Sequence, residues 1–326
     1  MIQNVLKRFF AAVLLAWLAL APATSALAGP PHRFVVFGDS LSDPGNAFIL
    51  TRDLEIPPFA SLIPSAPYAR GAFHFSNGPT WIEQLSLIDH ALPSAGPALL
   101  LPVVLSNYAV GGARARQVGA FDLPTQVGLF VSDFHGKAPA NAVYVVFFGG
   151  NDVRDALGAL AIDPTGATSV GILTDALSAI RSNLLTLYAA GARRFLVPNL
   201  PDIALAPAVR LSGPQAQAGA HFLSTQFNGG LELTLQGLER ALGIEIVRLD
   251  VFGLVNQVVA APAAFGLSDV QDPCIRLNTV VGAFCANPGK FLFWDGIHPT
   301  VAGHHLLAVR ADAALDARAL PVAAAP

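Results

Sequence analysis

The chain has 326 residues, of which 53% are hydrophobic and 13% charged, and its formal net charge is −3 at pH 7. This length fits one large domain or two small ones, and no shift in composition divides the chain, so a single domain is expected. No basic patch favours nucleic acid as a partner.

The first 28 residues have the order of a secretory signal peptide. Lys7 and Arg8 precede an apolar run over residues 9–20, and Ala28 closes a stretch of small residues. Basic, apolar and small residues in that order are what export and cleavage require, with a retained membrane anchor as the alternative. We therefore expect a secreted or periplasmic protein.

Removal of this segment leaves residues 29–318 as the expected domain and residues 319–326 as a frayed tail. Two basic residues leave with the signal peptide, so the mature chain carries 17 basic and 22 acidic residues. An exported protein meets an oxidising compartment, and the chain has only two cysteines. Cys274 and Cys285 are therefore expected to form a disulfide, with two buried free thiols as the alternative.

Five short apolar runs recur along the chain, at residues 34–37, 103–110, 142–148, 195–197 and 244–249. Each is nearly free of charge, as strands buried on both faces of a parallel sheet are. The uncharged stretches 91–113 and 251–268 are long enough to be considered as membrane spans. Prolines interrupt both, so buried strand, loop or short helix is expected there instead.

Helical spacing fills the gaps between the later runs. Leu177, Ile180 and Leu184 recur at intervals of three or four residues, and Gly191 follows where a helix should end. The leucines and phenylalanine between residues 223 and 242 repeat this spacing, and Gly243 follows them. Helix, glycine and strand in alternation predict right-handed crossovers and a three-layer α/β/α domain.

In an open parallel sheet, function lies at the carboxyl ends of the strands. The first predicted strand leads into Phe-Gly-Asp-Ser-Leu-Ser-Asp at residues 37–43. A nucleophilic serine needs a sharp turn that presents both its Oγ and its backbone N–H to the substrate. Ser40 is thus a candidate nucleophile, with a helix N-cap serine as the alternative and Ser42 as the neighbouring hydroxyl.

Two other strand ends carry groups that could stabilise a developing negative charge. Gly111 and Gly112 follow the second predicted strand, and Asn151 follows the third. Backbone N–H groups and a neutral side-chain amide both stabilise an oxyanion when they are fixed in place. The structural alternatives are simple turn glycines, and an Asx turn or helix cap at the asparagine.

The C-terminal region contains Trp-Asp-Gly-Ile-His-Pro-Thr at residues 294–300. A general base needs a carboxylate to orient it, and a spacing of three residues on a tight turn lets Asp295 reach the ring of His298. The alternative is a metal site that these two residues would form with His304 and His305.

Four residues occur in the order of the four sequence blocks of the SGNH, or GDSL-type, hydrolase family: Ser40, Gly112, Asn151 and His298. Residues 37–46 and 295–300 closely match the first and last blocks, and the resemblance covers residues 34 to about 310. It implies an α/β fold, a three-layer α/β/α sandwich with a mainly parallel five-stranded flavodoxin-like sheet.

The resemblance also implies a role for each residue. Ser40 would be the nucleophile and His298 the general base, with Asp295 orienting the base. The oxyanion would be held by the N–H of Ser40, the N–H of Gly112 and the amide of Asn151. Gly112 is preferred to its neighbour because the family's glycine lies five residues after the asparagine of the second block.

The implied function is a secreted serine ester hydrolase, an esterase or lipase that forms an acyl-serine and needs no cofactor or metal. The long first block and the cysteines before the last block resemble the branch with plant lipases and bacterial phospholipases and acyltransferases. The expected partner is a small-molecule or lipid ester, with transient contact to a lipid surface left open. Alternatives are an acyltransferase, a phospholipase, a carbohydrate O-acetylesterase and a non-catalytic binding module.

Overall fold

The computed structural model describes residues 33–51, 73–91, 93–275 and 284–319. The predicted signal peptide at residues 1–28 and the last seven residues of the predicted tail lie outside the described residues.

Four parallel strands form the central sheet in the order β1-β2-β3-β4. Their bounds are β1 (Arg33–Gly38), β2 (Ala142–Phe147), β3 (Arg194–Pro198) and β4 (Ile246–Leu249). Every residue of β2 is buried, which explains why its sequence is an unbroken apolar run. The predicted α/β class is correct.

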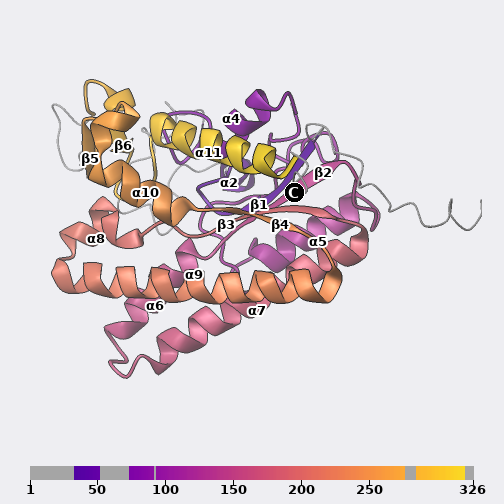
Figure 1. The fold of residues 1–326 in the computed structure, drawn as a ribbon, viewed down its shortest axis with the longest axis horizontal. Coiled ribbons are helices and arrows are strands. Elements are labelled where there is room, and N and C mark those ends of the chain that lie inside the picture. The colour runs from indigo at the N-terminus through magenta and orange to yellow at the C-terminus, as the bar shows by residue number, and fades with distance from the viewer. Residues whose placement is uncertain (1–32, 52–72, 92, 276–283, 320–326) are drawn as a thin grey trace, which may run out of the picture.

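Helices cover both faces of this sheet (Figure 1). One layer contains α4 (Trp81–Ile88) and α11 (Val301–Ala319), which pack on each other. The opposite layer contains α5 (Leu123–Asp133), α6 (Gly150–Leu160), α7 (Ala167–Ala190) and α9 (Pro214–Leu242). The main hydrophobic core lies between the strands and these two layers.

The two helices predicted from leucine spacing both exist and end at the predicted glycines. Gly191 caps α7 with a φ of 114°, and Gly243 caps α9 with a φ of 63°. Both φ values lie in the left-handed region that glycine adopts at no steric cost, so each helix stops there and the chain enters the next strand.

The second predicted strand, at residues 103–110, is wrong as a regular strand. Its residues 106–110 lie parallel to β1 on the edge away from β2 but form only one bridge to β1, between Val36 and Asn107. Serine side chains replace the ladder at the start of β1, because Ser94 Oγ accepts from the Phe34 N–H and Ser106 Oγ donates to the Phe34 carbonyl. The described sheet therefore has four strands, not the expected five.

A second, smaller sheet was not predicted. It pairs β5 (Asp269–Pro273) with β6 (Phe291–Phe293) in parallel, just before the candidate base. The remaining elements are α2 (Asn46–Thr51), η2 (Ile203–Leu205), α8 (Pro207–Leu211), α10 (Val251–Ala260), η3 (Pro262–Phe265) and η4 (Pro288–Lys290). Within the described ranges, no helix combines the length and the apolar character needed to cross a membrane.

Cys274 and Cys285 form a disulfide, as predicted. The Cys274 N–H donates to the carbonyl of Phe293, and the next N–H, of Ile275, donates to the carbonyl of Trp294. The disulfide therefore fastens the segment that leads directly into Asp295.

Candidate active site

Ser40 lies in a turn immediately after β1. The Ser42 N–H closes this turn on the Asp39 carbonyl, and Asp39 Oδ1 accepts from the Leu41 N–H. A Cβ on Gly38 would lie 3.1 Å from the Cβ of Ser42, so a glycine at this strand end lets the chain fold back sharply. The turn holds the Ser40 hydroxyl at the carboxyl end of the sheet.

Asp295 and His298 occupy a second tight turn, after β6. Asp295 Oδ1 accepts from the N–H groups of Ile297 and His298, each at 2.7 Å. The Trp294 N–H donates to the His298 carbonyl and closes the turn. This local bonding explains how a spacing of three residues brings the carboxylate to the ring.

A chain of hydrogen bonds joins these two turns. His298 Nδ1 lies 2.6 Å from Asp295 Oδ2, and His298 Nε2 lies 2.9 Å from Ser40 Oγ. A carboxylate accepts, so Nδ1 carries the ring hydrogen and Nε2 is left as the acceptor for the serine hydroxyl. All three side chains are buried. The arrangement can remove a proton from Ser40 while the carboxylate stabilises the imidazolium that forms.

The competing hydroxyl of Ser42 faces a different partner. Its Oγ accepts from the indole N–H of Trp81 at 3.0 Å, and the residue is completely buried. Ser42 therefore ties the turn to α4, while Ser40 contacts the base.

The two neighbouring glycines also differ. The Gly111 N–H donates to Asp43 Oδ2 at 2.8 Å, so that amide is already used within the protein. Gly112 has a φ of 80°, and among the described residues neither its N–H nor that of Ser40 donates to a protein acceptor. Two backbone donors near the serine thus remain available to a substrate.

Asn151 lies in the first turn of α6, where Gly149 occupies the N-cap position, so the predicted alternative of a helix cap is wrong. Its Nδ2 donates to the Ala113 carbonyl at 2.8 Å and lies 3.5 Å from Asp39 Oδ2. An amide nitrogen has two hydrogens, and here the second one makes only the long hydrogen bond to Asp39 Oδ2, which a closer acceptor could replace.

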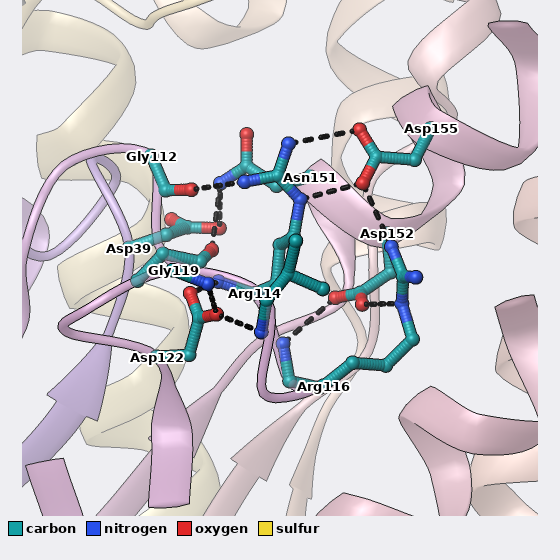
Figure 2. Close-up of polar contacts among 12 residues, drawn as sticks. Asp39, Gly112, Arg114, Arg116, Gly119, Asp122, Asn151, Asp152 and Asp155 are labelled. Carbon is teal, nitrogen blue, oxygen red and sulfur yellow. Dashed lines mark hydrogen bonds and ion pairs between the residues drawn. The ribbon is translucent and has the colours of Figure 1, made fainter. Parts of the chain in front are cut away.

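Asp39, the residue before Ser40 in the sequence, has a buried carboxyl group whose Oδ2 accepts from Asn151 Nδ2 at 3.5 Å (Figure 2). Desolvation by burial raises its pKa to about 6, against the opposing effect of the hydrogen bond from the Leu41 N–H.

A network of ion pairs surrounds the glycine loop, and sequence analysis missed it. Arg114 Nε and Nη2 bond to Asp155, while Arg116 bonds to both Asp152 and Asp155 (Figure 2). Asp122 Oδ1 accepts from the Arg114 N–H at 2.7 Å. The only signal in the sequence is an alternation of arginines directly after the glycine pair, which a solvated loop would show equally well.

The two other histidines of the C-terminal segment do not join Asp295 and His298. His304 is buried, and its Nδ1 accepts from the Trp81 N–H; His305 Nδ1 lies 3.2 Å from Gln84 Oε1. In the part of the chain that the structure describes, no three His, Cys, Asp or Glu side chains gather as metal ligands would.

Phe75 packs beside the ring of His298. Its ring centroid lies 5.3 Å from that of His298, and a Cβ on Gly111 would clash with the ring at 2.3 Å. Ser76 Oγ donates to the Pro299 carbonyl and so fastens the segment that carries Phe75 to the turn that carries His298. A small apolar cluster continues from Phe75 to Trp294 near the disulfide.

Several known proteins have sequences similar to this chain. The chain is 28% identical to the thermolabile hemolysin of Vibrio parahaemolyticus over 85% of its own length and 62% of the hemolysin. It is 30% identical to an uncharacterised Pseudomonas putida protein, of which it spans 52%. A GDSL esterase/lipase of Arabidopsis thaliana is 28% identical, with 84% of each chain covered.

Among solved structures, an acetyl xylan esterase variant from Geobacillus stearothermophilus superposes with a TM-score of 0.48 at 15% identity, covering 88% of this chain and 96% of the esterase. The family profile described as GDSL-like Lipase/Acylhydrolase matches residues 34–311, which contain all the site residues described above. The protein belongs to the GDSL-like lipase/acylhydrolase family.

Proposed function

We propose that this protein is a carboxylic ester hydrolase that forms an acyl-enzyme on Ser40. The observation that carries the proposal is the unbroken hydrogen-bond chain from Asp295 through His298 to the serine hydroxyl. Nucleophile, base and orienting acid in contact are the signature of this chemistry on unrelated folds.

In the first half-reaction, Ser40 Oγ bonds to the ester carbonyl carbon while its proton moves to His298 Nε2. The carbonyl oxygen becomes an oxyanion, and Asp295 stabilises the imidazolium. Collapse breaks the bond to the alcohol, which takes the proton from Nε2 as it leaves. In the second half, His298 Nε2 removes a proton from water as the water oxygen bonds to the acyl carbon. The bond from that carbon to Ser40 Oγ then breaks, Oγ takes the proton back from Nε2, and the carboxylic acid leaves.

Three donors are proposed to bind the oxyanion: the N–H of Ser40, the N–H of Gly112 and the Nδ2 amide of Asn151. Support comes from the two backbone N–H groups without a protein acceptor in the described residues and from the second amide hydrogen, whose bond to Asp39 Oδ2 is long, at 3.5 Å. Donors that are fixed before the reaction need no reorganisation when charge appears, so their effect falls on the transition state.

We propose that the enzyme acts outside the cytoplasm on a small-molecule or lipid ester. The disulfide between Cys274 and Cys285 supports an oxidising compartment, because such bonds persist there and are rare in the cytosol. Rates on p-nitrophenyl esters of increasing chain length, phospholipid and acetylated sugar would establish the acyl and alcohol preferences.

Labelling with a fluorophosphonate, followed by intact-mass measurement, tests the nucleophile. The mature protein should gain one adduct and Ser40→Ala none. Ser42→Ala is the matched control, because it removes a hydroxyl two residues away that contacts Trp81 and not the base. An adduct on Ser42, or a protein that never labels, would overturn the proposal; the second result would favour a non-catalytic binding module.

A further inference from the structure

We propose that Arg114 is a positioning residue that holds the Gly112 peptide in place beside Asn151 and thereby sets the strength of the oxyanion site. The proposal rests on the hydrolase function proposed above. It concerns a side chain that would touch neither the substrate nor the catalytic serine and base.

Arg114 bridges two elements through a single guanidinium. Its Nη1 donates to the Gly112 carbonyl at 3.3 Å, while Nε and Nη2 bond to the two oxygens of Asp155 at 2.5 and 3.0 Å. Figure 2 shows the guanidinium between the glycine loop and α6. A bidentate arginine pair of this kind fixes orientation as well as distance.

Arg114 joins two segments, the glycine loop and α6, and each carries one of the proposed oxyanion donors. Gly112 supplies the backbone N–H, and Asp155 lies four residues after Asn151, about one turn along the same helix. The Asn151 amide itself also bonds to the loop, at the Ala113 carbonyl. Arg114 thus adds a second tie between the loop and the helix.

The peptide that joins Gly112 to Ala113 also donates its Ala113 N–H to the Val110 carbonyl at 3.1 Å, so Arg114 holds the carbonyl side of that peptide. Asp43 holds the preceding amide, at Gly111, and Asp122 holds the Arg114 N–H. A glycine at a φ of 80° has no side chain of its own to pack, and its backbone is the least restricted of any residue. The Gly112 N–H belongs to the preceding peptide, so the bond to the Gly112 carbonyl positions it by restricting rotation about the Gly112 backbone. Without that bond, Gly112 can change its φ and ψ and turn its N–H away from the oxyanion.

Replacement of Arg114 by methionine keeps the apolar stem and removes the guanidinium. We expect kcat to fall by about 10-fold to about 100-fold, which is no more than the loss caused by removing one oxyanion donor outright. KM should change by less than about twofold. The loss should appear in kcat because the misplaced N–H matters only once the carbonyl becomes tetrahedral.

Arg248→Met is the matched control. Arg248 also bonds to two carboxylates, Glu232 and Glu239, and its side chain is 26% exposed, close to the 23% of Arg114. It joins β4 to α9 and contacts none of the site residues. Both variants should lose similar stability, but Arg248→Met should keep a kcat close to that of the wild type.

A trifluoromethyl ketone adds to the serine to form a tetrahedral oxyanion. Its inhibition constant should not change if the replaced residue serves only to stabilise the fold. Its inhibition constant should rise for Arg114→Met in parallel with the loss of kcat. Arg114→Lys keeps one donor but not the bidentate pair, so it should give an intermediate kcat. If Arg114→Met does not fold, Asp155→Asn weakens the same pair and should act in the same direction.

The positioning role is refuted if Arg114→Met and Arg248→Met lower kcat equally, or if the loss appears in KM while the inhibition constant is unchanged. A failure of the proposed hydrolase function would give a different result. Ser40→Ala would then keep its activity, or the wild type would not label with fluorophosphonate.

Discussion

Asn151→Ala separates transition-state stabilisation from structural support at one residue. The Asn151 amide has two hydrogens, of which one bonds to the Ala113 carbonyl at 2.8 Å. Alanine removes this structural bond together with the hydrogen proposed to bind the oxyanion. The variant should therefore show two losses of different kinds.

The two magnitudes follow from these contacts. Leaving the buried Ala113 carbonyl without its donor should cost about 1 to 3 kcal/mol in the free energy of unfolding. Loss of one oxyanion donor typically lowers kcat by about 10² to about 10³, or roughly 2.7 to 4 kcal/mol of transition-state stabilisation. KM should change little, because the ground-state carbonyl oxygen is a weaker acceptor in a different position.

Asn183→Ala is the matched control for the structural loss. Asn183 lies in α7, is 8% exposed against 6% for Asn151, and donates Nδ2 to the Ala179 carbonyl at 2.9 Å. Urea denaturation and steady-state kinetics on the same preparations of both variants give the two losses side by side. Equal destabilisation with a large fall in kcat only for Asn151→Ala is expected.

An Asn151→Ala variant that is destabilised like Asn183→Ala but keeps kcat within about threefold of the wild type would refute the reasoning. The oxyanion would then be held by the backbone N–H groups of Ser40 and Gly112 alone. A fall in stability without the Asn183 comparison would decide nothing, since both roles predict it.

Three further predictions follow from the same contacts. His298→Ala should lose nearly all activity, whereas His304→Gln should keep a kcat/KM close to that of the wild type; burial lowers the pKa of His304 to about 3, so that ring stays neutral near pH 7, and equal losses in both variants would contradict this assignment. Replacing Cys274 and Cys285 by serine should lower the unfolding free energy by about 3 kcal/mol in urea titrations, unless peptide mapping finds both thiols free in the native protein. Burial raises the pKa of Asp39 to about 6 in the folded protein from its ordinary value of 3.8, so its contribution to stability is present at low pH and is lost as pH rises through about 6. The wild type should therefore gain about 1 kcal/mol more stability than Asp39→Asn when the pH is lowered from 8 to 5, and an identical pH dependence in the two proteins would show that the carboxyl group is not perturbed.

Local pattern was sufficient for much of this protein. The helices that end at Gly191 and Gly243 follow from leucine spacing and from a glycine that can adopt a positive φ. The turn that joins Asp295 to His298 is equally local, because its hydrogen bonds span at most four residues. The strands of the central sheet were recognisable because both faces are buried and the apolar runs are continuous.

The tertiary structure decided which of the two serines, Ser40 or Ser42, contacts the base. It also decided which of the two neighbouring glycines keeps a backbone N–H without a protein acceptor in the described residues. Ser40 and His298 are 258 residues apart in sequence, and their contact depends on the whole sheet between them. Ser42 Oγ bonds to Trp81 and the Gly111 N–H bonds to Asp43, so each group is already hydrogen-bonded to a residue distant in sequence. The sequence alone separated these neighbours only through family resemblance.

Two features were beyond the reach of local pattern. The segment at residues 103–110 looks like a strand, but serine side chains satisfy the neighbouring backbone of Phe34 in place of a ladder. The arginines that follow Gly112 look like solvated loop residues until α6 brings Asp152 and Asp155 against them. In both cases the outcome depends on which donors and acceptors remain unpaired after packing, and that is a property of the folded chain and not of any short stretch of it.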